Sequence, residues 1–590
     1  MKLCIAEKPS VARDLAEILG AKTRKDGYFE GNGYWVSWTI GHLCSLKDPE
    51  DYNPNWKYWK LEDLPIIPEQ FGIKLKDDLG IQRQFKTIEN LVKQADEVIN
   101  CGDAGQEGEL IQRWVLLKAK CNVPVKRLWI SSLTEEAIRE GFAKLKDAKD
   151  FDNLFAAGNS RAVGDWILGI NGTRLYTRKF GKEKMTLSVG RVQTPTLAMI
   201  VQRQKEIDAF KSEEYWELKT MYRETEFICQ IDRLKSEEKA KKGFEYLKDK
   251  PFTVTSFEQK EGKEGNPRLY DLTSLQVDGN KRFAFSAEET LKHIQNLYEK
   301  KLVTYPRVDT TYLSEDLHPK IPNIMSGLRD YKRFTESVLQ KPIPKSKTIF
   351  DDKKITDHHA IIPTGVAPSG ITPDEQRIYD LICRRFIAAF YPECKVSNTS
   401  VIGQVDKLTF KATGKQIIDQ GWRVVYEDIK VKAENSAKKE EEEKILPLFT
   451  EGESGPHEPF VHKGKTSPPK PYTEATLLRA MESAGKMVEN EEMRELMKEN
   501  GIGRPSTRAA IIETLFKRKY IEKKRKNIFA TPTGMHLIDT INNQLLKSPE
   551  LTGQWEFKLR QIEKGTYSSQ QFKDELFKMV RELTDEVIFN

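Results

Sequence analysis

Two strand–loop–helix units near the N-terminus constrain the fold of this chain more than any other feature. Residues 3–6 and 97–101 are short, largely apolar runs that are typical of buried strands, and each is followed by a polar loop. The first loop leads into a predicted helix over residues 11–19 with Ser10 as its cap, and the second into a helix that runs through Leu117. Repeated units of this kind predict an α/β domain with a parallel sheet.

Acidic residues follow both predicted strands. Glu7 comes directly after the first strand, and Asp103 and Glu107 lie in the loop after the second. Because both loops leave the carboxyl ends of parallel strands, we expect these carboxylates to converge at one sheet edge. Such an oxygen-rich pocket suits Mg²⁺, and Gly102 and Gly105 allow close approach of the backbone to a ligand. The competing interpretation is an acidic helix start that only complements the helix dipole.

A second candidate site lies in the middle of the chain, where Pro306 separates Tyr305 from Arg307. Residues two apart in extended backbone project to the same face, so a phosphodiester would contact both side chains. Attack by the tyrosine oxygen on phosphorus would give a covalent phosphotyrosine, which keeps the energy of the broken bond for resealing. Taken alone, this segment favours a structural tyrosine with a half-buried ring.

Length and composition narrow the class of protein. A chain of 590 residues predicts about four domains, and the formal charge of +7 is too mild to indicate nucleic acid by itself. The seven cysteines form no C-x-x-C pair, which excludes a zinc ribbon. Charges at positions 7 and 8 exclude a secretory peptide, and no apolar run reaches 18 residues. We therefore expect a cytoplasmic protein without a membrane partner.

The last third of the chain carries a pattern of its own. Thr473 is predicted to cap a helix over residues 474–484, and Ser506 or Thr507 a second helix over residues 508–519. The basic run 523–526 then leads into a strand-like stretch, so two helices and a hairpin predict a winged helix-turn-helix that follows a phosphate backbone. A solvated basic loop is the alternative.

Arg161 and Asp165 lie four apart in a predicted helix, and we expect them to form a pair on one face. A surface ion pair worth a few tenths of a kcal/mol is the simpler interpretation. In the functional interpretation, Asp165 holds Arg161 toward a DNA phosphate.

Eight sequence blocks in family order resemble the type IA DNA topoisomerases, and most closely their topoisomerase III branch. These blocks are residues 7–10, 103–109, 159–174, 187–197, 304–307, 356–364, 471–478 and 501–508. The first two resemble the TOPRIM domain, whose pattern is Asp-x-Asp-Arg-Glu-Gly. This chain has Gly105 in place of the second aspartate and Gln106 in place of the arginine. The resemblance therefore implies one Mg²⁺ site at Glu7, Asp103 and Glu107, and a second site would lack a carboxylate.

The resemblance also implies an ATP-independent reaction. One DNA strand is cleaved through a 5′-phosphotyrosine at Tyr305, another strand passes through the break, and the first is rejoined, which relaxes negative supercoils or decatenates DNA. The catalytic residues carried over are Tyr305, Arg307, Glu7, Lys8 and His358. The DNA-binding residues carried over are Arg161, Asp165, Ser188, Arg191, Gln193 and Arg508. The implied partner is DNA with single-stranded regions, and a helicase partner stays open.

The implied architecture is a multidomain α/β plus α+β torus. A Rossmann-like TOPRIM domain would cover residues 1–150, and a split winged-helix domain residues 151–212 and 470–590. A β-rich arch would cover residues 213–275 and 400–469, and the domain carrying the tyrosine residues 276–399. The charge run 433–444 is predicted to be a linker. The rival classes are another TOPRIM or phosphotyrosine DNA-processing enzyme and a non-catalytic DNA-binding protein.

Overall fold

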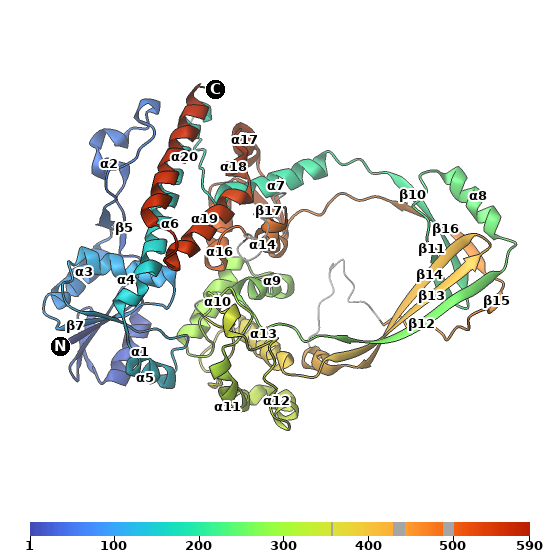
Figure 1. Cartoon of the computed structure of the whole chain (residues 1–590), viewed down its shortest axis with the longest axis horizontal. Coiled ribbons are helices and arrows are strands. Elements are labelled where there is room, and N and C mark those ends of the chain that lie inside the picture. Colours follow the sequence, from blue (N-terminus) through green and yellow to red (C-terminus); the bar gives the residue numbers. More distant parts are fainter. Residues whose placement is uncertain (183–184, 356–357, 429–442, 488–500, 590) are drawn as a thin grey trace.

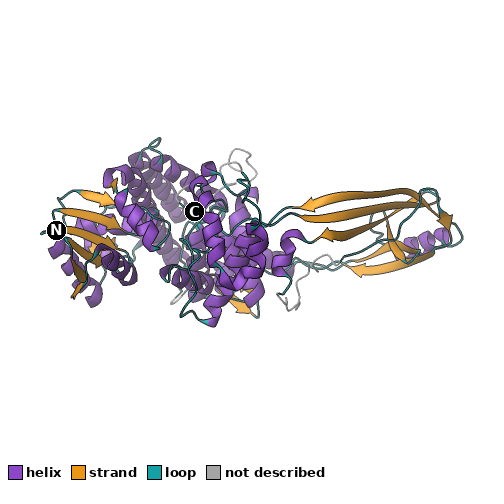
Figure 2. Cartoon of the chain, turned by 90° about the horizontal axis from the view of Figure 1, so that it is seen from below, coloured by secondary structure: helices purple, strands orange, loops and turns teal. Residues whose placement is uncertain are grey.

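A computed structural model describes residues 1–182, 185–355, 358–428, 443–487 and 501–589 of the chain. Residues 356 and 357 of the histidine block and most of the predicted linker 433–444 lie outside these ranges. Figure 1 shows an N-terminal sheet, a central body of helices and a second sheet that extends away from that body. In Figure 2, strands occupy both ends of the long axis and most helices lie between them.

The N-terminal sheet has seven strands in the order β2-β3-β4-β1-β7-β8-β9. Their bounds are β1 Lys2–Ala6, β2 Thr23–Lys25, β3 Tyr28–Gly31, β4 Tyr34–Trp38, β7 Glu97–Cys101, β8 Val125–Arg127 and β9 Lys146–Asp147. The four central strands are parallel, as predicted, whereas β2, β3 and β9 pair antiparallel at the edges. The sheet is therefore mixed rather than wholly parallel. Two further strands, β5 Cys44–Leu46 and β6 Ile73–Leu75, come between β4 and β7 in the sequence and form a small separate antiparallel sheet.

Helices α1 (Pro9–Leu19) and α4 (Gln106–Lys118) follow β1 and β7, as the sequence predicts. The predicted cap is wrong, because Lys8 is the N-cap of α1 and Ser10 lies in its first turn. A proline can occupy the first helical position since its missing N–H has no partner there, so the helix begins before Ser10. The remaining helices of this part are α2 Pro49–Tyr52, α3 Leu79–Val92 and α5 Glu135–Ala143.

Strand β1 joins two hydrophobic cores because its side chains alternate between faces. Leu3 and Ile5 pack in a core shared with the long helix α6 (Asp152–Phe180) and the C-terminal helices. Cys4 and Ala6 pack in a second core that includes Tyr305. The sheet thus lies between two bodies, and its acidic edge is placed near both.

Helices α6, α19 (Pro549–Glu563) and α20 (Ser569–Phe589) pack together in the first of these bodies. Gly164 in α6 faces Trp555 in α19, and a Cβ at this position would lie 2.7 Å from the indole. The other helices of this body are α7 Gln193–Asp208, α14 Glu474–Ser483, α16 Pro505–Lys517, α17 Pro532–Thr540 and α18 Gln544–Lys547.

The C-terminal pattern of two helices and a hairpin is present. Thr473 caps α14 as predicted, and strands β17 (Ile521–Lys524) and β18 (Asn527–Ala530) form the hairpin. Helix α16 starts earlier than predicted, because Pro505 occupies its first turn and Arg504 is the N-cap.

Tyr305 lies in an irregular segment among helices of the second body. These helices are α9 Leu272–Phe283, α10 Ala287–Glu299, α11 Ile321–Gly327, α12 Lys332–Leu339 and α13 Pro373–Ala389. The segment is fixed by backbone hydrogen bonds rather than by a sheet: the Thr304 N–H donates to the Ile362 carbonyl at 3.0 Å. Its conformation is therefore set in part by neighbouring non-helical segments, since Ile362 lies outside the helices and the adjacent Val303 forms an isolated bridge with Pro363.

The second sheet has the strand order β15-β12-β13-β14-β11-β10-β16, and all neighbouring strands in it pair antiparallel. Its elements are β10 Glu214–Tyr222, β11 Thr225–Cys229, α8 Glu237–Leu247, β12 Phe252–Glu264, β13 Cys394–Val405, β14 Leu408–Asp419, β15 Ser454–Gly455 and β16 Glu458–Lys465. The predicted boundary at residue 400 falls inside β13.

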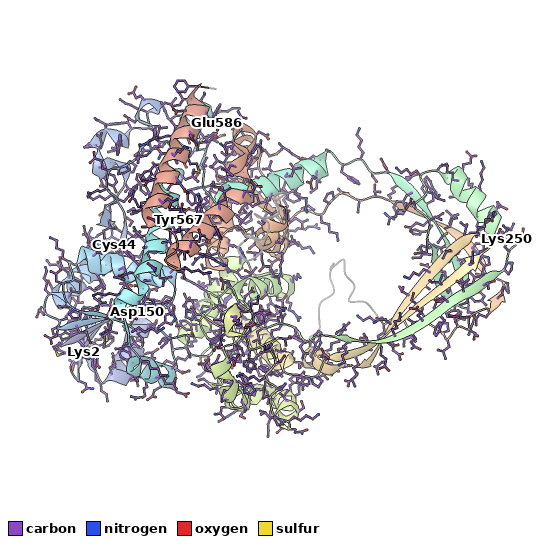
Figure 3. All side chains as sticks on the ribbon, in the orientation of Figure 1. Lys2, Cys44, Asp150, Lys250, Tyr567 and Glu586 are labelled. Carbon is purple, nitrogen blue, oxygen red and sulfur yellow. The ribbon has the colours of Figure 1, made fainter. Side chains whose placement is uncertain are left out.

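This sheet returns to the helical body at both ends, so the chain encloses an open space (Figure 1). Figure 3 draws all described side chains, and they leave the centre of that space open. Within the described residues, every helix is too short or too polar to cross a membrane.

Candidate active site and DNA-binding pocket

Glu7 and Asp103 meet at the carboxyl ends of adjacent strands, as the sequence predicts. The backbone N–H of Asp103 donates to Glu7 Oε2 at 3.2 Å. Burial, together with the nearby charge of Asp103, raises the pKa of Glu7 to about 7. Burial also raises the pKa of Asp103, although Lys8 and Arg307 oppose this shift. The pair therefore holds a proton more readily than ordinary carboxylates do.

A fully buried arginine holds the backbone of the acidic loop. Arg127 donates to the carbonyls of Gly102 and Asp103 at 2.7 and 2.8 Å, and to Glu109 Oε2 at 2.9 Å. This contact fixes the backbone that carries Asp103. Sequence reasoning missed Arg127, because nothing in the local pattern links a strand end to a loop more than 20 residues earlier.

Glu107 is more exposed to solvent than Glu7 and Asp103. Its side chain is 58% exposed and accepts from His42 Nε2 at 2.5 Å. This contact lowers the pKa of Glu107, and the charges of Arg307 and Arg161 act in the same direction. Sequence reasoning missed His42, which follows β4 on the same sheet edge.

The carboxylates at this edge fit a hard cation. Asp103 Oδ2 is buried next to the carboxylate of Glu7 and has no hydrogen-bond partner in the part of the chain that the structure describes. An unpartnered buried carboxylate oxygen is costly unless a cation or proton satisfies it. Among the described residues, no three His, Cys, Asp or Glu side chains gather as a ligand set. Two carboxylates are the usual protein share for Mg²⁺, so the donors present fit one such ion.

Tyr305 packs against the N-terminal part of the chain. Its backbone N–H donates to the Ser131 carbonyl at 2.9 Å, and its ring centroid lies 4.5 Å from that of His358. Tyr298 forms an edge-to-face contact with the same ring at 5.6 Å. The side chain is therefore buried between the two bodies, within an aromatic cluster.

Arg307 lies close to both the tyrosine and the carboxylates. Burial works against its charge, but Tyr305, Glu7 and Asp103 outweigh this and raise the pKa of Arg307. Its Nε atom is buried and has no hydrogen-bond partner within residues 1–182, 185–355, 358–428, 443–487 and 501–589. A donor in this position is suited to an anionic oxygen.

His358 bridges the same two parts of the chain. Its Nε2 contacts the Ala104 carbonyl and its Nδ1 lies 2.7 Å from Ser131 Oγ. Because a carbonyl only accepts, Nε2 carries the proton and Nδ1 accepts from the serine hydroxyl. Burial lowers the pKa of His358 to about 4, so the ring is neutral at pH 7.

Lys8 also reaches across the junction. Its Nζ lies 2.7 Å from Glu299 Oε1 at the end of α10, and Ser10 Oγ donates to the other oxygen of Glu299 at 3.3 Å. Glu299 was missed at the sequence level. Its partners lie about 290 residues away in sequence, and no local pattern indicates such a pair.

The predicted pair of Arg161 and Asp165 is wrong. Arg161 binds Glu556 with both terminal nitrogens and donates from Nε to Gln106 Oε1 at 3.0 Å. Asp165 instead accepts from Arg191 Nε at 3.0 Å. The buried carboxylate of Glu556 on α19 faces Arg161 directly, and this contact takes the place of the expected contact along α6.

Glu556 gathers three guanidinium groups. Besides Arg161, it accepts from Arg191 Nη1 at 3.0 Å, and Arg504 Nε lies 3.6 Å from its second oxygen. Burial alone would raise its pKa, but the arginines outweigh this and hold the pKa of Glu556 well below its usual range. The carboxylate is therefore a charged, fully buried hub between α6 and α19.

A pocket of about 980 Å³ adjoins this hub. Asp165, Ser188, Arg191 and Gln193 line it, together with Arg518. The guanidinium of Arg518 donates to both Ser188 Oγ and Gln193 Oε1. Four of the predicted DNA-binding residues thus meet in one pocket with cationic walls.

Arg508 lies elsewhere. Its side chain is buried, donates to the Gly503 carbonyl at 3.0 Å and reaches Thr273 Oγ1 on α9 at 2.8 Å. These contacts join α16 to the helical body that carries the tyrosine, and they do not lie in the pocket.

Comparison with known proteins identifies the family of this chain. Residues 2–133 match the Toprim domain, and residues 149–574 match the DNA topoisomerase family. The chain therefore belongs to the type IA DNA topoisomerases, enzymes whose substrate is DNA.

Within that family, the chain is a homologue of topoisomerase III. It is 40% identical to DNA topoisomerase 3 of Bacillus cereus over 99% of this chain and 81% of that protein. The corresponding protein of Bacillus subtilis is 39% identical over 96% of this chain and 79% of its own length. The fold resembles full-length topoisomerase I of Thermotoga maritima, with a TM-score of 0.75, 22% identity and coverage of 99% and 90% of the two chains.

Proposed function

We propose that Tyr305 is the nucleophile of this topoisomerase and that the carboxylates of the N-terminal sheet complete its active site. The observation that carries the proposal is the position of Tyr305 and Arg307 against Glu7 and Asp103, which come from the opposite side of one buried junction. The tyrosine oxygen attacks a phosphorus of single-stranded DNA. The P–O bond to the 3′-oxygen breaks, which leaves a 5′-phosphotyrosine and a free 3′-hydroxyl.

The raised pKa of Glu7 favours this residue as the acid in this step. With a pKa of about 7, roughly half of the Glu7 side chains carry a proton at neutral pH. That proton passes to the leaving 3′-oxygen, and the same carboxylate accepts it again when the 3′-hydroxyl attacks the phosphotyrosine. The phenol proton of Tyr305 leaves to solvent or to a neighbouring acceptor on cleavage and returns on rejoining.

Cationic and neutral donors hold the phosphate. Arg307 donates its Nε–H to a phosphoryl oxygen. Lys8 leaves its contact with Glu299 and binds the same phosphoryl group. His358, neutral and fixed by Ala104 and Ser131, positions the tyrosine ring. Glu7 and Asp103 would hold Mg²⁺, which when bound would supply charge neutralisation during rejoining, whereas Glu107 is paired with His42.

The cationic pocket and the C-terminal hairpin would guide the DNA. The pocket at Arg191, Ser188 and Gln193, with Asp165 and the nearby Arg161, would take the single-stranded segment that leads to Tyr305. Helices α14 and α16 with the basic hairpin would act as a winged-helix element along the backbone.

Strand passage would use the open space between the helical body and the second sheet (Figure 3). The junction at Tyr305 parts after cleavage, a second strand crosses, and the junction closes before rejoining. In this torus the second sheet acts as the arch that keeps the two parts connected.

Relaxation of negatively supercoiled plasmid tests the assignment. The reaction contains Mg²⁺ and no ATP, and compares the wild-type protein with Tyr305→Phe, which keeps the ring and loses only the hydroxyl. We expect relaxation by the wild type and none by the variant. Equal activity of the two proteins would reject Tyr305 as the nucleophile.

A further inference from the structure

We propose that Gln106 is a DNA-binding residue that donates from its amide to a phosphate between the cationic pocket and the scissile bond. This inference rests on the proposed function, since it concerns DNA bound across Tyr305. It assigns a contact to the position where the TOPRIM pattern has an arginine and this chain does not.

The first observation is an unpartnered donor. Gln106 is 6% exposed, and its Nε2 is buried with no hydrogen-bond partner on any residue that the structure describes, whereas its Oε1 accepts from Arg161 Nε at 3.0 Å. Since the oxygen faces a donor, the amide orientation is fixed and the NH₂ group points away from Arg161. A buried amide with no acceptor costs free energy that a ligand oxygen would recover.

The second observation is the location of Gln106. It is the first residue of α4, between Gly105 and Glu107, and α6 packs closely against it: a Cβ at Gly158 would lie 3.1 Å from Gln106 Cγ. The side chain therefore has little freedom to turn toward another partner. Its amide is held where the acidic loop meets α6.

The third observation is what contacts the acidic loop on either side. Arg161 donates to the Gln106 side chain at 3.0 Å, and His358, whose ring lies 4.5 Å from that of Tyr305, contacts the carbonyl of Ala104 two residues before Gln106. In our proposal Tyr305 attacks the scissile phosphate, and Arg161 lies beside the DNA pocket. A backbone that runs from one to the other passes Gln106, and its phosphate oxygens are the acceptors that the amide lacks.

Single methylphosphonate substitutions in a fluorescent single-stranded oligonucleotide test this contact. Each substitution removes the charge and one oxygen of one phosphate. All proteins carry Tyr305→Phe, so that no strand is cut. Affinities are measured for the protein that keeps Gln106 and for the same protein with Gln106→Leu or Gln106→Glu. The control is Gln94→Leu, the same change at an exposed glutamine of the N-terminal part.

With Gln106 present, we expect one linkage at which the substitution weakens binding by about ten-fold. That penalty should fall below about three-fold in both Gln106 variants and stay unchanged in Gln94→Leu. The Gln106→Glu variant is decisive because its carboxylate still accepts from Arg161 but has no N–H to donate. It also covers the case in which Gln106→Leu does not fold.

Two outcomes would overturn the inference. If the penalty survives in Gln106→Glu, Gln106 acts only by holding Arg161. If it survives in both variants, the amide makes no phosphate contact. Either result leaves the function of Tyr305 untouched, because that assignment fails only when Tyr305→Phe relaxes plasmid as well as the wild type does.

Discussion

At the scale of single residues, the proposed active site is built from groups whose burial changes their protonation. Glu7 keeps a proton near neutral pH because burial and Asp103 disfavour its charge. His358 loses its proton for the same reason, since a buried imidazole disfavours the cationic form. One site thus contains an acid that is protonated and a base that is neutral at the same pH, each set by its surroundings.

The raised pKa of Glu7 predicts a pH-dependent stability. The folded state binds its proton more tightly than the unfolded state, so this group favours folding at low pH and that contribution is lost between pH 4.5 and about 7. Glu7→Gln removes the cost of ionisation. Without metal, we expect the variant to be more stable than the wild type at pH 8 by up to about 3 kcal/mol, and to lose that advantage at pH 4.5.

Thermal unfolding in chelator at a series of pH values measures this difference. A constant offset between Glu7→Gln and wild type across the whole range would show that the proton on Glu7 is not linked to folding.

Gly105 predicts a change in metal requirement. The residue has extended backbone, with φ at 165°, and a Cβ at this position would meet no atom within 4 Å. Gly105→Asp can therefore add the missing carboxylate without strain. We expect rejoining to need less Mg²⁺ than in the wild type, measured as the half-saturating concentration for resealing of a cleaved oligonucleotide. Gly105→Asn, equal in size and uncharged, should keep the wild-type requirement; the same decrease in both variants would exclude a metal effect.

At the scale of elements, the contact of α6 with α19 depends on charge as much as on packing. Glu556 lies among Arg161, Arg191 and Arg504 in a buried position. Loss of this carboxylate leaves guanidiniums buried without a counter-charge, which is a costly change.

Glu556→Gln should therefore lower the free energy of unfolding by about 3–5 kcal/mol. Glu582→Gln on α20 is the matched control, because that side chain is 67% exposed and its nearest lysine nitrogen is 3.9 Å away. It should change stability by less than about 0.5 kcal/mol. Denaturant unfolding compares the two, and a loss below 1 kcal/mol in Glu556→Gln would mean that the arginines find other partners.

The elements themselves were largely predictable from the sequence. Strand Glu97–Cys101, the Thr473 cap and the C-terminal hairpin follow from local periodicity and capping chemistry. Helix starts at Pro9 and Pro505 were placed too late, because the proline was not counted as the first helical residue. Local rules describe such elements well since their causes lie within a few residues.

Pairs between remote elements were not predictable in this way. Lys8 pairs with Glu299 and Arg161 pairs with Glu556, in both cases across hundreds of positions. Local spacing suggested Asp165 as the partner of Arg161 and suggested no partner for Lys8. The carboxylate edge was an exception. Glu7 and Asp103 were expected together because parallel strands bring their carboxyl ends to one edge, which is a rule about topology rather than local sequence.

At the scale of the whole molecule, the tyrosine-bearing body is held by two sets of contacts. Toward the N-terminal sheet these include the pairs of Lys301 with Asp14 at 3.1 Å and of Lys8 with Glu299. Toward the C-terminal helices they include Arg508 with Thr273, and the Ala287 N–H that donates to Glu474 at 2.9 Å. In the proposed mechanism, strand passage requires at least the first set to part.

A covalent link across the first set should separate cleavage from strand passage. Asp14→Cys with Lys301→Cys places two thiols at a part-buried pair, where a short bismaleimide can bridge them. We expect the linked protein to cleave and rejoin a single-stranded oligonucleotide but to relax no plasmid. Each single-cysteine variant treated with the same reagent is the control. Relaxation by the linked protein would show that the strand crosses elsewhere.

The arch meets the body through two antiparallel ribbons. One consists of the ends of β10 and β16, continued by the Thr466 N–H that donates to the Glu213 carbonyl at 2.9 Å. The other has three strands: β12 and β13, where Glu264 faces Cys394, and β14, whose Asp419 pairs with Lys395. Interstrand hydrogen bonds hold the strands of each ribbon in a fixed register. In the proposed cycle the two cut ends therefore stay attached through two ribbons while the junction is open, so closing brings back the same two ends for the phosphodiester to be remade.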